Sequence, residues 1–227
     1  MAKRIEGARG RLSRDVIVAC AIALADREGL EAVTIRRLAQ EQGVTPMAMY
    51  WHFSDKDSLL NGIAEELIAA VKLPDPTDEP WDRQLHAILA AFLAAIRPHP
   101  AVAGLALRRI LIAEPGLALA EQALALIRSA GFPPDQAAGA GSFLLCAVIT
   151  LVTSQPGRPW HLLEGEAREQ MFREKRAALD VLSPARYPSV LASAPWLVTC
   201  QDEDTYYALN LNLLVQGIKG IQPARPA

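Results

Sequence analysis

A run of ring side chains in the first quarter of the chain is the feature best suited to binding chemistry. If residues 45–52 form a helix, Met49 and Phe53, four apart, face inward and pack as core, while their neighbours face outward. A surface helix so rich in rings and poor in charge suits a DNA major groove, where thymine methyls take apolar contacts and phosphates accept hydrogen bonds. The outward set is Met47, Ala48, Tyr50, Trp51 and His52.

Other chemistry-bearing residues do not form a recognisable enzyme site. The sequence contains no nucleophile elbow, zinc-protease motif, P-loop or dinucleotide-binding glycine motif. We therefore expect no enzyme activity, cofactor or metal, although an enzyme without a recognisable motif stays a less favoured alternative. Cys20 and Cys146 fall on apolar helix faces, where buried, inert thiols are the default. Cys200 precedes the last helix, so a redox-sensing DNA-binding regulator acting through Cys200 is the second alternative.

Composition favours a helical, globular chain. Of 227 residues, 51% are hydrophobic and 6% aromatic, and alanine and leucine dominate the apolar part. The apolar run 143–152 is too short to span a bilayer, and no secretory signal begins the chain, so we expect a cytoplasmic protein. The net charge of −2 does not by itself indicate nucleic-acid binding, but residues 1–14 carry five basic side chains against Glu6 alone.

Caps and breakers divide the chain into short helices. Ser13 and Gly29 bound the first helix, Thr34 and Gly43 the second, and Thr45 begins a third that runs to residue 52. A capping-box-like start at 54–57, with Asp57 in the third position, opens the fourth helix. The proline-rich, acidic stretch 72–80 is the predicted linker. We expect a basic arm at 1–10, a DNA-binding domain at 11–71 with its helix-turn-helix at 34–53, and a C-terminal domain at 81–227.

The C-terminal segment is also predicted to be helical. We expect helices at 81–97, 101–112, 117–129, 136–153, about 164–182 and 204–221, and no alternation persists long enough for a strand. The predicted fold class is all-α, with a three-helix helix-turn-helix domain joined through the fourth helix to a larger C-terminal domain for ligand binding and dimerisation.

The N-terminal pattern resembles the DNA-binding domain of TetR-family transcriptional regulators over roughly residues 11–71. The matching residues are Leu38, Ala39, Gly43, Val44, Tyr50, Trp51, His52, Phe53, Lys56, Leu59 and Leu60. The resemblance implies that helix 3 reads bases and that Lys56 binds a phosphate at the start of helix 4. It also implies that Arg11 and Arg14 reach flanking DNA. The implied DNA contacts are Arg36, Thr45, Pro46, Met47, Ala48, Tyr50, Trp51, His52 and Lys56.

A homodimer would place two helix-turn-helix units about 34 Å apart on a palindromic operator in double-stranded DNA. The helix at 136–153 is apolar on nearly every face, and the last helix repeats large apolar residues at intervals of four and three. The alternative is that both helices are ordinary core within one subunit. The candidate dimer residues are Leu144, Val148, Tyr207, Leu211, Leu214 and Ile218.

The remaining helices are expected to enclose a pocket for a small-molecule effector. The resemblance implies a repressor that its effector releases from DNA. Drug-binding members of the family place a metal-chelating histidine and polar contacts where this chain has Ile88 and Ala106, so we expect a fairly hydrophobic effector. The candidate ligand residues are His86, Phe92, His99, Leu105, Arg109, Ile112, Phe143 and Met171.

Overall fold

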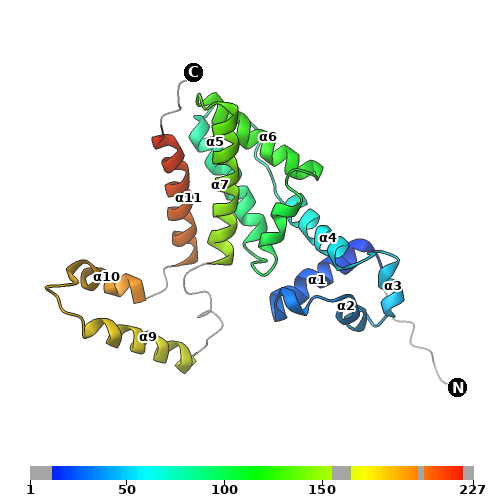
Figure 1. Ribbon diagram of the computed structural model, residues 1–227, viewed down its shortest axis with the longest axis horizontal. Helices are drawn as coiled ribbons and strands as arrows, with labels where there is room; N and C mark the ends of the chain where they lie inside the picture. The colour runs from blue at the N-terminus through cyan, green and yellow to red at the C-terminus, as the bar shows by residue number, and fades with distance from the viewer. Residues whose placement is uncertain (1–11, 155–164, 199–201, 222–227) are drawn as a thin grey trace. The chain divides into compact units, whose positions relative to one another are not determined.

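The computed structural model describes residues 12–154, 165–198 and 202–221 (Figure 1). All the regular elements in these ranges are helical, which confirms the predicted all-α class. The chain divides into two compact units, one formed by residues 1–153 with 221–227 and the other by residues 154–220. Each unit is described by itself below.

The first unit begins with four helices, α1 (Arg14–Glu28), α2 (Ile35–Glu41), α3 (Pro46–Tyr50) and α4 (Lys56–Ala69), which we call the headpiece. The Ser13 hydroxyl accepts a hydrogen bond from the backbone N–H of Val16, so α1 begins where its cap predicts. Gly29 ends α1 with a φ of 88°, a conformation that glycine adopts without a Cβ clash. A short 3₁₀ turn, η1 (Leu30–Ala32), then leads toward α2.

Two expectations about the later headpiece helices are corrected. Helix α3 is only one turn long and ends at Tyr50, so Trp51 and His52 follow it in a turn. Helix α4 is capped by Asp55, and the third position of its capping box is Ser58, not Asp57. The Ser58 side chain is short enough to reach back to the backbone N–H of Asp55, at 3.2 Å.

The headpiece shares its core with a segment from beyond the linker. Buried side chains from α1, α2, α3 and α4 form one cluster, which also includes Val102 and Leu105. These two residues lie in and beside a 3₁₀ segment, η2 (Ala103–Arg108), that packs against α4. The first unit is therefore continuous in packing from the headpiece to η2.

The rest of the first unit consists of α5 (Trp81–Ile96), α6 (Glu114–Ser129) and α7 (Pro134–Thr153), which pack against one another. The predicted helix at 101–112 is wrong, because this stretch holds η2 and turns. Its backbone N–H groups bond three residues back, as from Leu105 to Val102, and not four. Gly116 allows the turn to approach α6, since a Cβ atom there would overlap the Ile110 carbonyl.

Helix α7 is more apolar over its length than the run 143–152 suggested. Among the described residues, it is the one helix long and apolar enough to cross a membrane by length and composition, and 39% of its most apolar window is buried. The core helix of a globular protein passes the same test. Here its buried side chains, including Leu144 and Val148, pack in a unit where α7 contacts both α5 and α6.

The second unit contains α9 (Gly165–Asp180), α10 (Pro188–Val198) and α11 (Glu203–Gly220). Helices α9 and α10 pack side by side (Figure 1). Helix α10 was not predicted from the sequence, and it carries Pro195 inside it. Helix α11 buries one face through Tyr207, Leu211, Val215 and Ile218.

Candidate nucleic-acid interface

A tight turn joins α2 to α3 and sets the angle between them. Gly43 has a φ of 64°, and the backbone N–H of Val44 bonds back to the Ala39 carbonyl at 2.9 Å. The Thr34 hydroxyl caps α2 by accepting from the backbone N–H of Arg37 at 3.1 Å. The pair is a helix-turn-helix at the predicted position.

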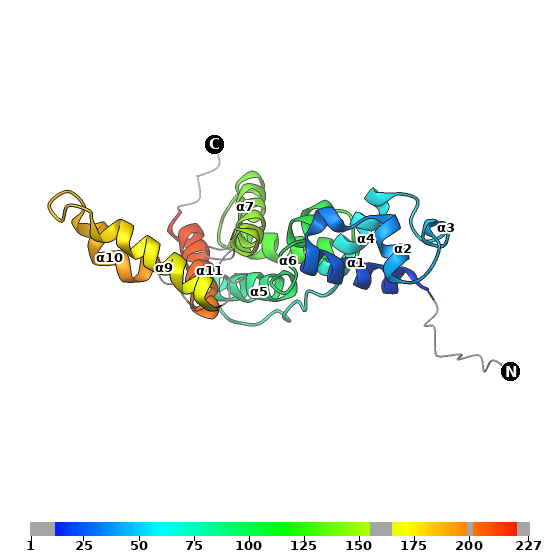
Figure 2. The same ribbon diagram turned by 90° about the horizontal axis from the view of Figure 1, so that it is seen from below.

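Helix α3 and the turn after it expose part of the ring-rich surface that the spacing predicts, since Ala48 and His52 are half-buried. Met49 and Phe53 are fully buried, whereas Met47, Tyr50 and Trp51 are 68%, 50% and 85% exposed. Figures 1 and 2 both show α3 at the edge of the headpiece. Large apolar side chains exposed together on a charge-poor surface are typical of a binding site.

The start of α4 supplies a cation next to this surface. Lys56 is exposed, but the N–H of Ser58 already donates to the Asp55 carboxylate at 2.7 Å, so not all of the terminal N–H groups are free for a phosphate. This backbone bond also holds the pKa of Asp55 below its ordinary value of 3.8. The Lys56 ammonium is thus the group here best placed for a phosphate oxygen.

The arginines near the interface differ in what they already bind. Arg36 is exposed, and none of the ion pairs found in the described part of the chain includes it. Arg37 is held by Glu28 at 2.9 Å and Glu41 at 3.0 Å. The Arg14 guanidinium lies 4.5 Å from the centre of the Phe53 ring while its side chain is 47% exposed, and its reach to flanking DNA stays a prediction. Arg11 lies outside the described residues.

Three long-range polar contacts between side chains join the headpiece to the segment around η2. The first joins His99 to Asp26 in α1 at 2.7 Å. The others join η2 and its following residue to α4: Arg108 to Asp57 at 3.0 Å, and Arg109 to Glu65 at 2.7 Å. These contacts could not be predicted from the sequence, because partners more than 40 residues apart leave no signal in local charge patterning.

The candidate ligand residues differ in exposure and in the contacts that they make. Phe92 and Leu105 are buried, His86 is half-buried, and Ile112 and Phe143 are 62% and 57% exposed. His99 and Arg109 bind Asp26 and Glu65, and Met171 belongs to the second unit.

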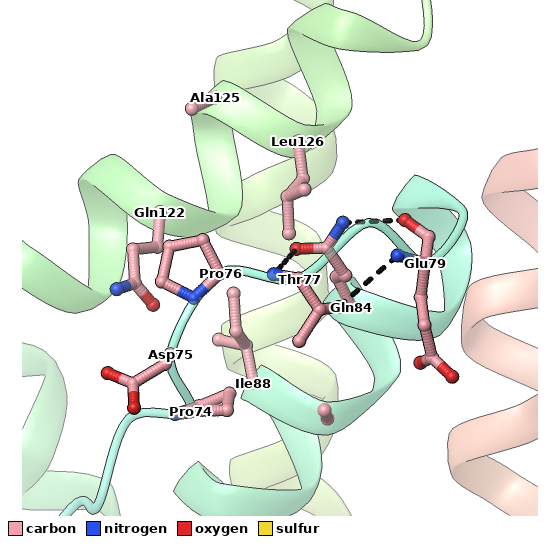
Figure 3. A pocket seen from close by; sticks show the side chains of 11 residues that line it. Pro74, Asp75, Pro76, Thr77, Glu79, Gln84, Ile88, Gln122, Ala125 and Leu126 are labelled. Carbon is pink, nitrogen blue, oxygen red and sulfur yellow. Dashed lines mark hydrogen bonds between the residues drawn. The ribbon is translucent and has the colours of Figure 1, made fainter.

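A cavity of about 220 Å³ lies elsewhere, between the linker, α5 and α6 (Figure 3). None of the eight candidate ligand residues lines it. Its walls are mainly apolar, and Ile88 of α5 and Leu126 of α6 approach each other across it. The Gln84 amide holds the linker in place by accepting from the N–H of Thr77 at 3.2 Å and donating to the Glu79 carbonyl. The lining residues are Pro74, Asp75, Pro76, Thr77, Glu79, Gln84, Ala87, Ile88, Gln122, Ala125 and Leu126.

The candidate dimer residues are mostly buried already within one chain. Leu144, Val148, Tyr207, Leu211 and Ile218 are each at most 5% exposed, and Leu214 is half-buried. The exposed large apolar residues on the same helices are Phe143, Leu209 and Leu213. Of the cysteines, Cys20 is half-buried, Cys146 is exposed where a buried thiol was expected, and Cys200 lies outside the described residues.

Comparison with known proteins matches two family models to the chain. Residues 17–63 match the family model of bacterial regulatory proteins of the tetR family, and residues 73–221 match the tetracyclin repressor-like C-terminal domain. A curated relative, an HTH-type transcriptional regulator from Saccharopolyspora erythraea, is 29% identical over 81% of this chain and 75% of its own length. The class C tetracycline repressor of Escherichia coli is 26% identical over 92% and 91%.

Solved structures agree in fold. The TetR family protein ActR of Streptomyces coelicolor, in complex with actinorhodin, superposes with a TM-score of 0.75 at 25% identity, covering 92% of this chain and 96% of that one. The relatives are regulators of transcription and not enzymes.

Proposed function

The chain belongs to the tetR family of bacterial regulatory proteins, and from that premise we propose that it is a homodimeric repressor, released from a palindromic operator by a small, fairly hydrophobic effector. The exposure of Met47, Tyr50 and Trp51 at α3 carries the DNA-binding part of this proposal. These side chains form a surface that inserts into a major groove, while Lys56 and Arg36 beside it supply charge for the phosphates.

The dimer part rests on the exposed apolar residues of two helices. Leu144 and Tyr207 are buried within the chain, so contact with a second copy is left to their exposed neighbours. Phe143 on α7 is one such neighbour, and Leu209 and Leu213 on α11 are the others. A dimer gives the DNA two half-site contacts at the spacing that one chain alone cannot provide.

The effector part rests on the cavity beside the linker. Its apolar walls favour an apolar ligand, and its position puts a ligand against the segment that connects α4 to α5. ActR binds actinorhodin in its own crystal structure, and the class C relative is described as a tetracycline repressor. A ligand shifts the DNA-binding equilibrium only through its different affinities for the bound and released forms.

The test is selection of DNA by the purified full chain from a random-sequence duplex pool. We expect an inverted repeat to be enriched, and a labelled copy of it to bind with an affinity that falls as salt rises. The Tyr50→Ala, Lys56→Ala double variant should lose this binding while keeping the helical circular dichroism of the wild type. A pool in which nothing is enriched would overturn the proposed function.

A further inference from the structure

We propose that Glu65 is a positioning residue for the recognition helix, because its carboxylate links Arg109, beyond the linker, to Arg14, which lies over Phe53 directly after α3. This inference rests on the proposed function, since it concerns how the DNA-reading surface is held. The four side chains come from α1, α4, the turn after α3 and the residue after η2, all within the first unit.

The first link joins the C-terminal segment to α4. Nη2 of Arg109 lies 2.7 Å from Oε1 of Glu65 in an ion pair, and the Arg109 side chain is 24% exposed. Its Nε atom is buried and has no hydrogen-bond partner in the described structure. In the described part of the chain, Glu65 is the carboxylate that pairs with this guanidinium, so the position of the Arg109 side chain is tied to Glu65.

The second link joins the same carboxylate to α1. Oε2 of Glu65 lies 3.5 Å from Nη2 of Arg14, so one carboxylate lies between two guanidinium groups. Without it, these two like charges would lose the anion that both contact. Removing Glu65 thus affects both arginines at once, whereas removing either arginine leaves the other pair able to form.

The third link reaches the recognition helix. The Arg14 guanidinium lies 4.5 Å from the centre of the Phe53 ring, a cation–π contact on a fully buried ring. The backbone N–H of Phe53 bonds to the Met49 carbonyl at 3.0 Å, which ties the ring to the last turn of α3. A shift of Arg14 is thereby passed to the segment that carries Tyr50 and Trp51.

A second ion pair between the same elements provides a matched comparison. Arg108 binds Asp57 at 3.0 Å, and Asp57 lies at the start of α4, two turns before Glu65. Arg108→Gln and Arg109→Gln remove the same charge from adjacent positions, but only Arg109 shares its carboxylate with Arg14. Of these two arginines, only Arg109 should therefore show coupling to Arg14 in its effect on DNA affinity.

The experiment is a double-mutant cycle on DNA affinity. The probe is the labelled duplex that the wild-type chain enriches from a random pool, and binding is measured by fluorescence anisotropy. The variants are Arg14→Gln, Arg109→Gln, Arg108→Gln and the two doubles that contain Arg14→Gln. Glu65→Gln is measured beside them, and thermal unfolding of each variant shows that the chain folds.

We expect Glu65→Gln to weaken DNA binding about two- to fivefold, and Arg109→Gln to have a smaller effect once Arg14 is replaced. The effects of Arg108→Gln and Arg14→Gln on the free energy of DNA binding should add. Additive effects of Arg109→Gln and Arg14→Gln on affinity, or an unchanged affinity for Glu65→Gln, would overturn the inference. Absence of specific binding by the wild type would overturn the proposed function instead, so the two failures are distinguishable.

Discussion

Nδ1 of His99 lies 2.7 Å from Oδ2 of Asp26, and this pair fastens the turn after α5 to α1 across 73 residues of sequence. Because about a third of each side chain is exposed, we expect Asp26→Ala to lower the free energy of unfolding by about 0.5–1 kcal/mol. Urea unfolding measures the change. Asp78→Ala, at an exposed linker position, should leave the midpoint unchanged, and equal effects of the two substitutions would contradict the role of the pair.

Trp51 is 85% exposed and should matter for DNA more than for folding. We expect Trp51→Ala to weaken operator binding about tenfold or more, because the ring loses its contact with the groove or backbone. The thermal midpoint should stay within error of the wild type. Trp196→Ala removes a ring that is 67% exposed in α10, and it should alter neither quantity. Equal losses of DNA affinity in both variants would argue against a reading surface at α3.

We expect Lys56 to raise the affinity for DNA through contact with a phosphate and to contribute nothing to the choice of sequence. Lys56→Gln should weaken specific and non-specific duplexes to a similar extent, and reduce the slope of log affinity against log salt by about 1. Titrations at several salt concentrations give this slope. Lys72→Gln makes the same charge change at an exposed residue just after α4 and should keep the wild-type slope. A Lys56→Gln variant whose slope is unchanged would show that the ammonium does not bind phosphate.

Asp55 should stabilise α4 only while it is ionised. Its pKa is lowered mainly by the backbone N–H of Ser58, so the stabilisation is complete above the ordinary value of 3.8 and is lost as the pH falls through the lower folded value. We expect Asp55→Ala to lower the thermal midpoint at pH 7, and the difference from wild type to shrink below pH 3.8. A difference that stays constant from pH 7 to pH 3 would contradict this role of the carboxylate.

Local signals predicted the headpiece well because its helices begin and end at capping residues. Ser13, Thr34 and Gly43 act at their predicted positions, and the inward spacing of Met49 and Phe53 gave the exposed face of α3. The stretch at 101–112 was wrong because its apolar residues suit a helix, but its packing against α4 favours a tighter turn.

Contacts between distant residues could not be predicted in the same way. Glu65 has no local feature that marks it as the partner of Arg14 and Arg109, since only the fold brings the three together. The candidate dimer residues show what helical spacing cannot decide. A helix face that is apolar at this spacing suits an interface with a second copy and the core of one chain equally well. Tyr207 and Leu211 are buried in that way.

Gly62 gives a further test of how α3 is held. A Cβ atom at this position of α4 would lie 3.0 Å from Cε1 of Phe53 and 3.3 Å from Nη2 of Arg14, so the ring packs directly on the helix backbone. Alanine improves helix propensity by about 1 kcal/mol, but overpacking in a core costs about 1–3 kcal/mol. We therefore expect Gly62→Ala to lower the free energy of unfolding by about 1 kcal/mol. It should also weaken DNA binding, because the backbone N–H of Phe53 bonds to Met49 in the last turn of α3.

The smaller side chain in Phe53→Leu supplies the control for this prediction. In the Phe53→Leu background the added methyl group displaces a smaller side chain. Gly62→Ala should therefore lower the free energy of unfolding and the DNA affinity by less than it does in the wild type. Urea unfolding and operator anisotropy on the four proteins of this cycle measure the coupling. If Gly62→Ala were to cost the same in both backgrounds, its effect would come from the backbone of α4 and not from the Phe53 ring.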